Sequence, residues 1–229
     1  MAFTTVLFDL DGTLIDSIQL ILDSYHHTLA VHRLPARTDA EWLAGLGTPL
    51  SVQFRQWSED PDRLAQLIAT YRQYNLSNHD TMVTAYPGVV EMVGVIRRAG
   101  LRTGLVTSKN RTGALRGLRH VGLEAAMDLV IGADEVTNPK PHPEPIRVAL
   151  DRLAELPEHA IYIGDSVHDM VSGRAAGVAT GAVLWGPFGR VDLEGTDPDY
   201  WLDRPADVLS VLGLAGESSN GFSDRRNAD

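Results

Sequence analysis

Residues 4–13 read TTVLFDLDGT, a β-branched and apolar run that ends in two aspartates and a glycine. The run Thr4–Leu10 is too apolar for a strand with one exposed face and is typical of a strand covered on both sides. Asp9 and Asp11 are two positions apart, and side chains at that spacing project to the same side of an extended chain. The segment therefore predicts a buried strand with two carboxylates at its tip.

Helical patterns alternate with four more short apolar runs along the rest of the chain. Val89–Arg98 and Glu144–Leu153 repeat apolar residues at the spacing of an amphipathic helix. Strands that alternate with helices are typical of βαβ units. We therefore predict an α/β fold with a Rossmann-like parallel β-sheet core flanked by helices. The further runs are Arg102–Thr107, Leu129–Gly132, Ala160–Gly164 and Thr180–Trp185.

The segment after the first strand interrupts this alternation because it has only helical patterns. An insertion of this kind predicts a small inserted α-helical cap domain, joined to the core through linkers near Ile15–Ser17 and Thr81–Gly88. The expected helices of the insertion span residues 18–31, 39–46, 50–57 and 61–74. The expected units are a core of residues 1–15 and 83–214, a cap of residues 16–82 and a disordered tail of residues 215–229.

Composition and charge exclude several classes of function. The 229 residues include 20 Lys and Arg against 30 Asp and Glu, a net charge of −10, which argues against nucleic-acid and anionic-membrane partners. The absence of cysteine excludes thiolate metal sites and thiol nucleophiles. No apolar stretch approaches the roughly 18 residues of a membrane span, and the first residues lack the pattern of a signal peptide. We therefore expect a cytoplasmic protein.

Polar residues follow the other predicted strands where each one ends. Thr107 and Ser108 follow one strand, Asp165 and Asp169 follow another, and Lys140 lies in a proline-rich loop between them. Ligands of parallel sheets bind at these carboxyl ends. Lys140 is one of only two lysines in the chain, which suggests a need for a compact ammonium group. Together the tips offer oxygen ligands for Mg²⁺ and donors for a phosphoryl group.

The ordered set of motifs resembles the haloacid dehalogenase superfamily over about residues 1–210. The resemblance rests on Asp9-Leu-Asp11-Gly-Thr-Leu, Thr107, Lys140-Pro-x-Pro and Gly164-Asp165-Ser-x-x-Asp169. Within the superfamily the chain is most similar to the phosphoglycolate phosphatase and cap-bearing pyrophosphatase subgroup. The resemblance implies that the helical insertion is the small cap of that family.

The resemblance also implies roles for the carboxylates. Asp9 would attack phosphorus and form an aspartyl-phosphate. Asp11 would protonate the leaving oxygen and later accept a proton from water. The side chains of Asp9 and Asp165, with the backbone carbonyl of Asp11, would hold Mg²⁺. Asp169 would bind the metal through water or orient Lys140.

Two further assignments concern the substrate. The resemblance implies that Thr107 and the N–H of Ser108 bind phosphoryl oxygens, with Lys140 as the neighbouring cation. A loop between cap helices, with candidate residues Gly45, Gly47 and Thr48, lies where the family places its substrate-reading loop. A plain interhelical turn is an equally good interpretation of that loop. His142 and His168 lie beside motifs and are interpreted as bystanders.

These features predict a Mg²⁺-dependent phosphatase acting on a small phosphorylated metabolite. The alternatives are a phosphomutase of the β-phosphoglucomutase type, an inorganic pyrophosphatase and a non-enzymatic binding protein on the same fold. The mutase is disfavoured because the cap sequence lacks the basic, serine-rich motif of those enzymes. The sequence leaves the substrate and the oligomeric state open.

Overall fold

The computed structural model describes residues 2–215 and contains a six-stranded parallel sheet with the strand order β5-β4-β1-β6-β7-β8. The order places β1 in the middle, paired with β4 on one side and β6 on the other. The predicted α/β fold with a parallel core is confirmed. The strands are β1 Thr5–Phe8, β4 Arg102–Val106, β5 Leu129–Ile131, β6 Ala160–Gly164, β7 Ala179–Val183 and β8 Tyr200–Leu202.

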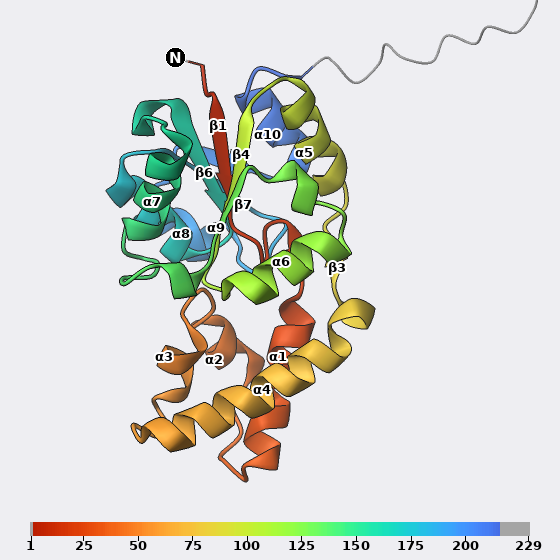
Figure 1. The fold of residues 1–229 in the computed structure, drawn as a ribbon, viewed down its shortest axis with the longest axis vertical. Helices are drawn as coiled ribbons and strands as arrows, with labels where there is room; N and C mark the ends of the chain where they lie inside the picture. Colours follow the sequence, from red (N-terminus) through yellow and green to blue (C-terminus); the bar gives the residue numbers. More distant parts are fainter. Residues whose placement is uncertain (1, 216–229) are drawn as a thin grey trace, which may run out of the picture.

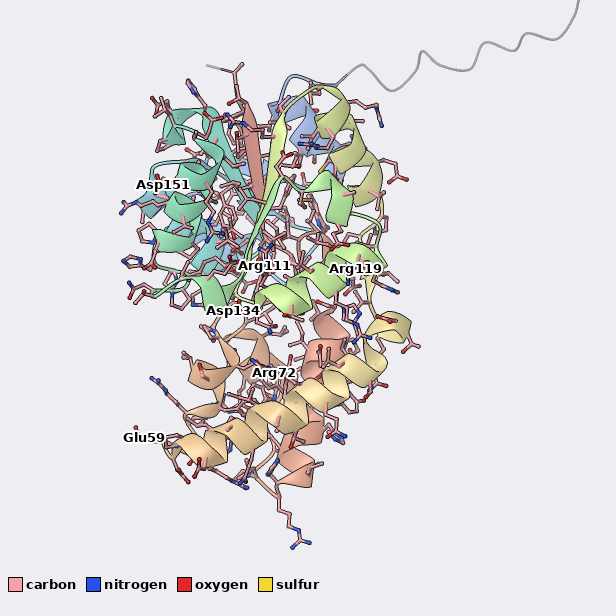
Figure 2. The ribbon with its side chains drawn as sticks, viewed as in Figure 1. Glu59, Arg72, Arg111, Arg119, Asp134 and Asp151 are labelled. Carbon is pink, nitrogen blue, oxygen red and sulfur yellow. The ribbon has the colours of Figure 1, made fainter. Side chains whose placement is uncertain are left out.

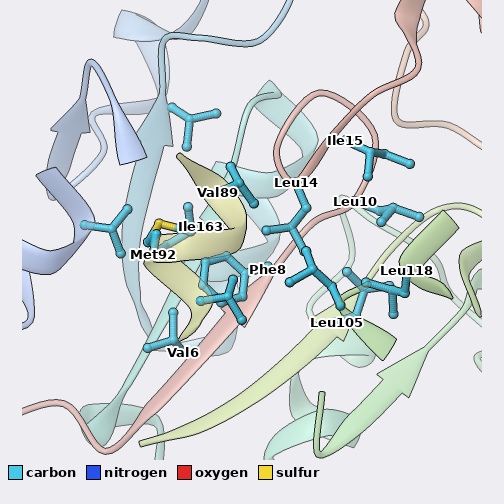
Figure 3. Close-up of a cluster of buried hydrophobic side chains, with 14 of the residues drawn as sticks. Val6, Phe8, Leu10, Leu14, Ile15, Val89, Met92, Leu105, Leu118 and Ile163 are labelled. Atoms are coloured by element: carbon cyan, nitrogen blue, oxygen red, sulfur yellow. The ribbon is translucent and has the colours of Figure 1, made fainter. Parts of the chain in front are cut away.

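Helices cover both faces of the sheet (Figure 1). The α-helices of this region are α5 Val89–Arg98, α6 Arg111–His120, α7 Glu144–Leu153, α8 Val167–Ala176, α9 Arg190–Leu193 and α10 Pro205–Val211. Short 3₁₀ turns span Glu124–Ala126, Ala133–Glu135, Pro157–His159 and Glu194–Thr196. Successive β1 side chains alternate between the two faces, as expected for a strand. Val6 and Phe8 pack with α5, α6 and α10 (Figure 3), whereas Leu7 packs with α7 and α8.

Four helices form the insertion, which lies below the sheet in Figure 1. They are α1 Ile18–Val31, α2 Asp39–Leu43, α3 Leu50–Phe54 and α4 Pro61–Met82. The insertion has its own aromatic core, in which Tyr25 stacks on Trp42 with ring centroids 3.9 Å apart. Its two ends meet the core as short antiparallel strands, β2 Ile15–Asp16 and β3 Thr84–Ala85. Both expected linkers therefore contain a strand, and the two strands pair with each other.

Several element boundaries differ from those expected. Helix α4 continues beyond Tyr74 to Met82, because its buried face is completed by the polar side chains of Asn75 and His79 rather than by apolar ones. The expected extensions of α2 to residue 46 and of α3 to residue 57 are wrong, since both helices end three residues earlier. Strand β8 was not expected, because three residues at a sheet edge give too short a pattern.

Some expectations stay predictions. The division into a core and a cap domain is one of them, as is the cytoplasmic location. Of the expected tail, only Ala215 belongs to the described part of the chain. No helix within residues 2–215 is long and apolar enough to span a membrane.

A carboxylate at the amino-terminal end of the sheet joins strands that are far apart in sequence. Glu155 accepts hydrogen bonds from the hydroxyls of Thr4 and Thr5, at 2.6 and 2.7 Å, and pairs with Arg102 at 2.8 Å. Burial would raise the pKa of Glu155, but the hydrogen bonds outweigh it and lower the pKa from 4.5 to about 2. The ionised form therefore stabilises the folded protein.

Replacement Glu155→Gln should destabilise the protein by roughly 1–2 kcal/mol at pH 7, a range that allows for solvent screening. Because the folded-state pKa is depressed, this contribution is present above pH 4.5 and disappears as the pH falls from 4.5 towards about 2. Urea unfolding at several pH values measures it, with the exposed Glu158→Gln as the control. An equal loss of stability at pH 7 and pH 2.5 would contradict this account.

Candidate active site

The strand order brings the sequence-predicted residues to one edge of the sheet. Asp9 directly follows β1, Thr107 follows β4 and Asp165 follows β6, and both neighbouring strands are in register with Phe8 at the end of β1. The backbone N–H of Asp9 continues the ladder by donating to the Ile163 carbonyl at 2.9 Å. The geometry of three adjacent parallel strands thus collects residues from three distant segments.

Lys140 is buried at this edge and contacts three oxygens. Its Nζ lies 2.9 Å from Asp9 Oδ1, 2.6 Å from Asp169 Oδ1 and 3.0 Å from the Tyr162 hydroxyl. Tyr162 also lies 2.8 Å from the Val106 carbonyl oxygen, which anchors the network to β4. Tyr162 was not among the predicted site residues, because it lies within an apolar strand and resembles an ordinary core aromatic.

The buried charges shift one another's pKa values. Burial would lower the pKa of Lys140, but Asp169 and Asp9 hold it above its ordinary value, so the ammonium stays charged. Burial raises the pKa of Asp9 to about 6, despite the opposing effect of Lys140. Burial and the neighbouring carboxylates Asp169 and Asp9 raise the pKa of Asp165 well above its usual range. The single positive charge of Lys140 therefore does not compensate the negative charges of the three carboxylates.

The remaining excess of negative charge fits a divalent cation. Oxygens of Asp9, Asp165 and Asp169 lie within 4.8 Å of one another. Asp169 is already engaged by Lys140 and by the hydroxyl and N–H of Ser166. Asp165 Oδ1 accepts from Thr13 at 3.1 Å, whereas its Oδ2 is buried without a hydrogen-bond partner in residues 2–215. Such an oxygen, beside Asp9, is a suitable ligand for a metal ion such as Mg²⁺.

Gly12 makes room for this carboxylate. A Cβ atom at Gly12 would lie 2.4 Å from Asp165 Oδ2, and the backbone there has a φ of +85°, which side chains disfavour. The glycine is therefore needed both for the turn after Asp11 and for the approach of Asp165 to the tip of β1.

The second carboxylate of the first motif lies in a different environment. Both Asp11 oxygens accept from Lys109 Nζ, at 2.8 and 3.0 Å, and Oδ1 also accepts from Ser17 at 2.5 Å. Lys109 was not predicted as a site residue, although the rarity of lysine was an available signal. The two aspartates therefore have different cationic partners, since Asp9 pairs with Lys140 and Asp11 pairs with Lys109.

A cavity of about 360 Å³ separates the strand tips from the insertion. Thr107 and Ser108 line it from the core, and the Ser108 hydroxyl is buried without a partner among residues 2–215. Gly47 and Thr48 line it from the loop between α2 and α3. Gly45 is not among the lining residues, and its carbonyl accepts hydrogen bonds from the side chains of Thr48 and Gln53.

Comparison with known proteins assigns the family. Residues 6–183 match the model of the haloacid dehalogenase-like hydrolases. The chain belongs to this family. The expected family and the expected class of enzyme, a hydrolase of the phosphatase type, are thereby confirmed.

Named relatives cover almost the whole chain. The pyrophosphatase PpaX of Anoxybacillus flavithermus is 39% identical over 93% of this chain and 99% of its own length. PpaX of Bacillus cereus is 40% identical over 95% of this chain and 100% of its own. Both alignments thus cover more than nine-tenths of this haloacid dehalogenase-like hydrolase.

Solved structures show the same fold. A haloacid dehalogenase-like family hydrolase from Streptococcus pneumoniae has a TM-score of 0.79 and 26% identity, covering 92% of this chain and 98% of that one. A predicted phosphoglycolate phosphatase from Haemophilus somnus has a TM-score of 0.82, covering 91% and 97%, and at 22% identity it shows the fold alone.

Replacement Lys140→Arg should lower kcat by about 10²–10³, the typical loss of one charge-stabilising contact in an active site. A planar guanidinium does not fit among three oxygens placed around a single ammonium nitrogen. Steady-state kinetics of the purified variant measures the loss, and thermal unfolding verifies that the variant is folded. Wild-type kcat in a folded variant would exclude a catalytic contribution from the ammonium group.

Proposed function

We propose that this hydrolase is a Mg²⁺-dependent phosphatase that cleaves a small phosphorylated metabolite through an aspartyl-phosphate on Asp9. The observation that carries the proposal is the position of Asp9, held 2.9 Å from the buried Lys140 ammonium and beside the Asp165 oxygen that has no hydrogen-bond partner within residues 2–215. A carboxylate oriented in this way, at the base of a cavity, is suited to nucleophilic attack.

The proposed reaction has two steps. An Asp9 oxygen attacks phosphorus, the bond from phosphorus to the leaving oxygen breaks, and Asp11 gives that oxygen a proton. Water then attacks the aspartyl-phosphate and gives a proton to Asp11, the phosphorus–Asp9 bond breaks, and phosphate is released. Asp11 must separate from Lys109 to take part, because both of its oxygens are paired in this structure.

Other residues stabilise the transferred group. Thr107 and Ser108 donate hydrogen bonds to the phosphoryl oxygens, and the Lys140 ammonium compensates the negative charge of those oxygens. Asp9, Asp165 and the Asp11 carbonyl would hold Mg²⁺, with Asp169 keeping Lys140 in place. The metal supplies positive charge that lets carboxylates and phosphate lie close together.

Inorganic pyrophosphate is the second candidate substrate. The relatives in Anoxybacillus flavithermus and Bacillus cereus are named pyrophosphatases. In this chain, Lys109 from the core and Arg72 from α4 both line the cavity, where they can compensate a second phosphate. Figure 2 labels Arg72 on α4. Phosphate release from pyrophosphate and from phosphoglycolate, measured side by side, decides between these substrates.

A phosphomutase would pass the phosphoryl group to a second hydroxyl instead of water. Phosphorus NMR of the products, after a screen of phosphorylated metabolites, separates the two outcomes. We expect free phosphate. Accumulation of an isomerised phosphate ester with little phosphate would overturn the hydrolase proposal in favour of the mutase.

Replacement Asp9→Asn should lower turnover by at least about 10³-fold and leave the fold intact, because the amide has the same shape but is not a nucleophile. Phosphate release and circular dichroism test this. The exposed Asp151→Asn on α7, labelled in Figure 2, is the matched control and should retain full activity. Substantial activity in Asp9→Asn would rule out an aspartyl-phosphate at this residue.

Removal of divalent cations with a chelator should abolish activity, and added Mg²⁺ should restore it, because the clustered carboxylates repel one another without a cation. Asp165→Ala should raise the Mg²⁺ concentration needed for half-maximal activity or abolish turnover. Activity against metal concentration measures both effects. Full activity in excess chelator would remove the metal from the mechanism.

A further inference from the structure

His168 forms the contact between the core and the loop that joins α2 and α3. It is the second residue of α8, two positions after the Ser166 cap of that helix and directly before Asp169. The His168 ring lies against the insertion, beside Gly47 of that loop. The expectation that His168 is a bystander therefore does not account for its position.

The approach of the loop to the core is close. A Cβ atom at Gly47 would lie 3.2 Å from His168 Nδ1 and 3.4 Å from the Ser166 hydroxyl. Gly47 also has a φ of +92°, a conformation that residues with a side chain disfavour. Two independent constraints, backbone conformation and space, thus favour glycine where the loop meets α8.

The contact lies across the site from the linkers. Figure 1 shows α2 and α3 on the side of the insertion opposite to β3, and the loop between them reaches towards the core. The covalent connection through β2 and β3 holds one side of the insertion, and the contact of Gly47 with His168 holds the other. Residues that follow the contact directly, Thr48 to Ser51, line the cavity.

We propose that His168 is a positioning residue that latches the loop of residues 45–51 onto the core and thereby sets its contacts with the leaving group. His168 itself is not among the residues that line the cavity, so it acts through the loop. Substrates whose leaving group reaches the loop depend on the latch, whereas a minimal ester depends on the strand tips alone. This inference rests on the proposed phosphatase activity.

The kinetic test compares His168→Ala, His168→Asn and the control Val167→Ala, an exposed neighbour on the same turn. The substrates are methyl phosphate and whichever of pyrophosphate and phosphoglycolate the wild type cleaves faster. His168→Ala should lower kcat/KM for the larger substrate roughly 3- to 10-fold, mainly through KM, as expected for the loss of one polar side-chain contact. Methyl phosphate should change less than twofold. His168→Asn, whose side-chain amide keeps a polar group at this position, should recover most of the loss.

A second readout follows the loop without catalysis. Hydrogen exchange of the amides of residues 45–51 should become faster in His168→Ala and stay unchanged in Val167→Ala. Gly47→Ala should lower kcat/KM less in the His168→Ala background than in the wild type. The added methyl group would then no longer approach the His168 ring, and only the Ser166 hydroxyl would remain close to it.

The outcomes separate the two proposals. Equal losses for both substrates, or unchanged exchange in residues 45–51, would overturn the latch. Absence of phosphate release from every substrate with the wild-type protein would overturn the phosphatase proposal, and hydrogen exchange would then still decide whether His168 holds the loop.

Discussion

The buried ammonium of Lys140 is the contact on which the arrangement of the site depends. It lies between Asp9 and Asp169, and the three charged groups are almost completely removed from solvent. Removing one partner from such a group leaves an uncompensated buried charge, which is costlier than the net gain of the intact group. Asp169 is fixed in turn by Ser166 and Tyr162, so the orientation of Asp9 depends on these two residues as well as on Lys140.

The sequence predicts those site residues that directly follow a buried strand and belong to a recognisable motif. Parallel strands with apolar runs end at one edge, so the residues after each run had to converge there. Asp9, Thr107 and Asp165 lie at adjacent tips for that reason. The helices of the insertion were predictable where an apolar repeat was present, and α4 was underestimated where Asn75 replaces an apolar residue on the buried face.

The parts that could not be predicted depend on distances between side chains. Tyr162 supports Lys140 through a hydroxyl that a strand pattern does not distinguish from an apolar ring. Lys109 reaches Asp11 across 98 positions of sequence, and His168 of α8 meets Gly47 in the loop between α2 and α3. Neither contact leaves a periodic signal in the chain, because each is set by tertiary packing rather than by local spacing.

The pairing of β2 with β3 also affects how enzymes with this fold can change their substrate preference. Because the two ends of the insertion leave the core side by side, the core is closed across a fixed gap whatever lies between them. The entropy of closing a loop grows only slowly with its length, by about 0.6 kcal/mol for each doubling. A longer or shorter set of helices at this position would therefore change the free energy of folding of the sheet only slightly. Substrate preference can change through exchange of the insertion while the strand tips keep their chemistry.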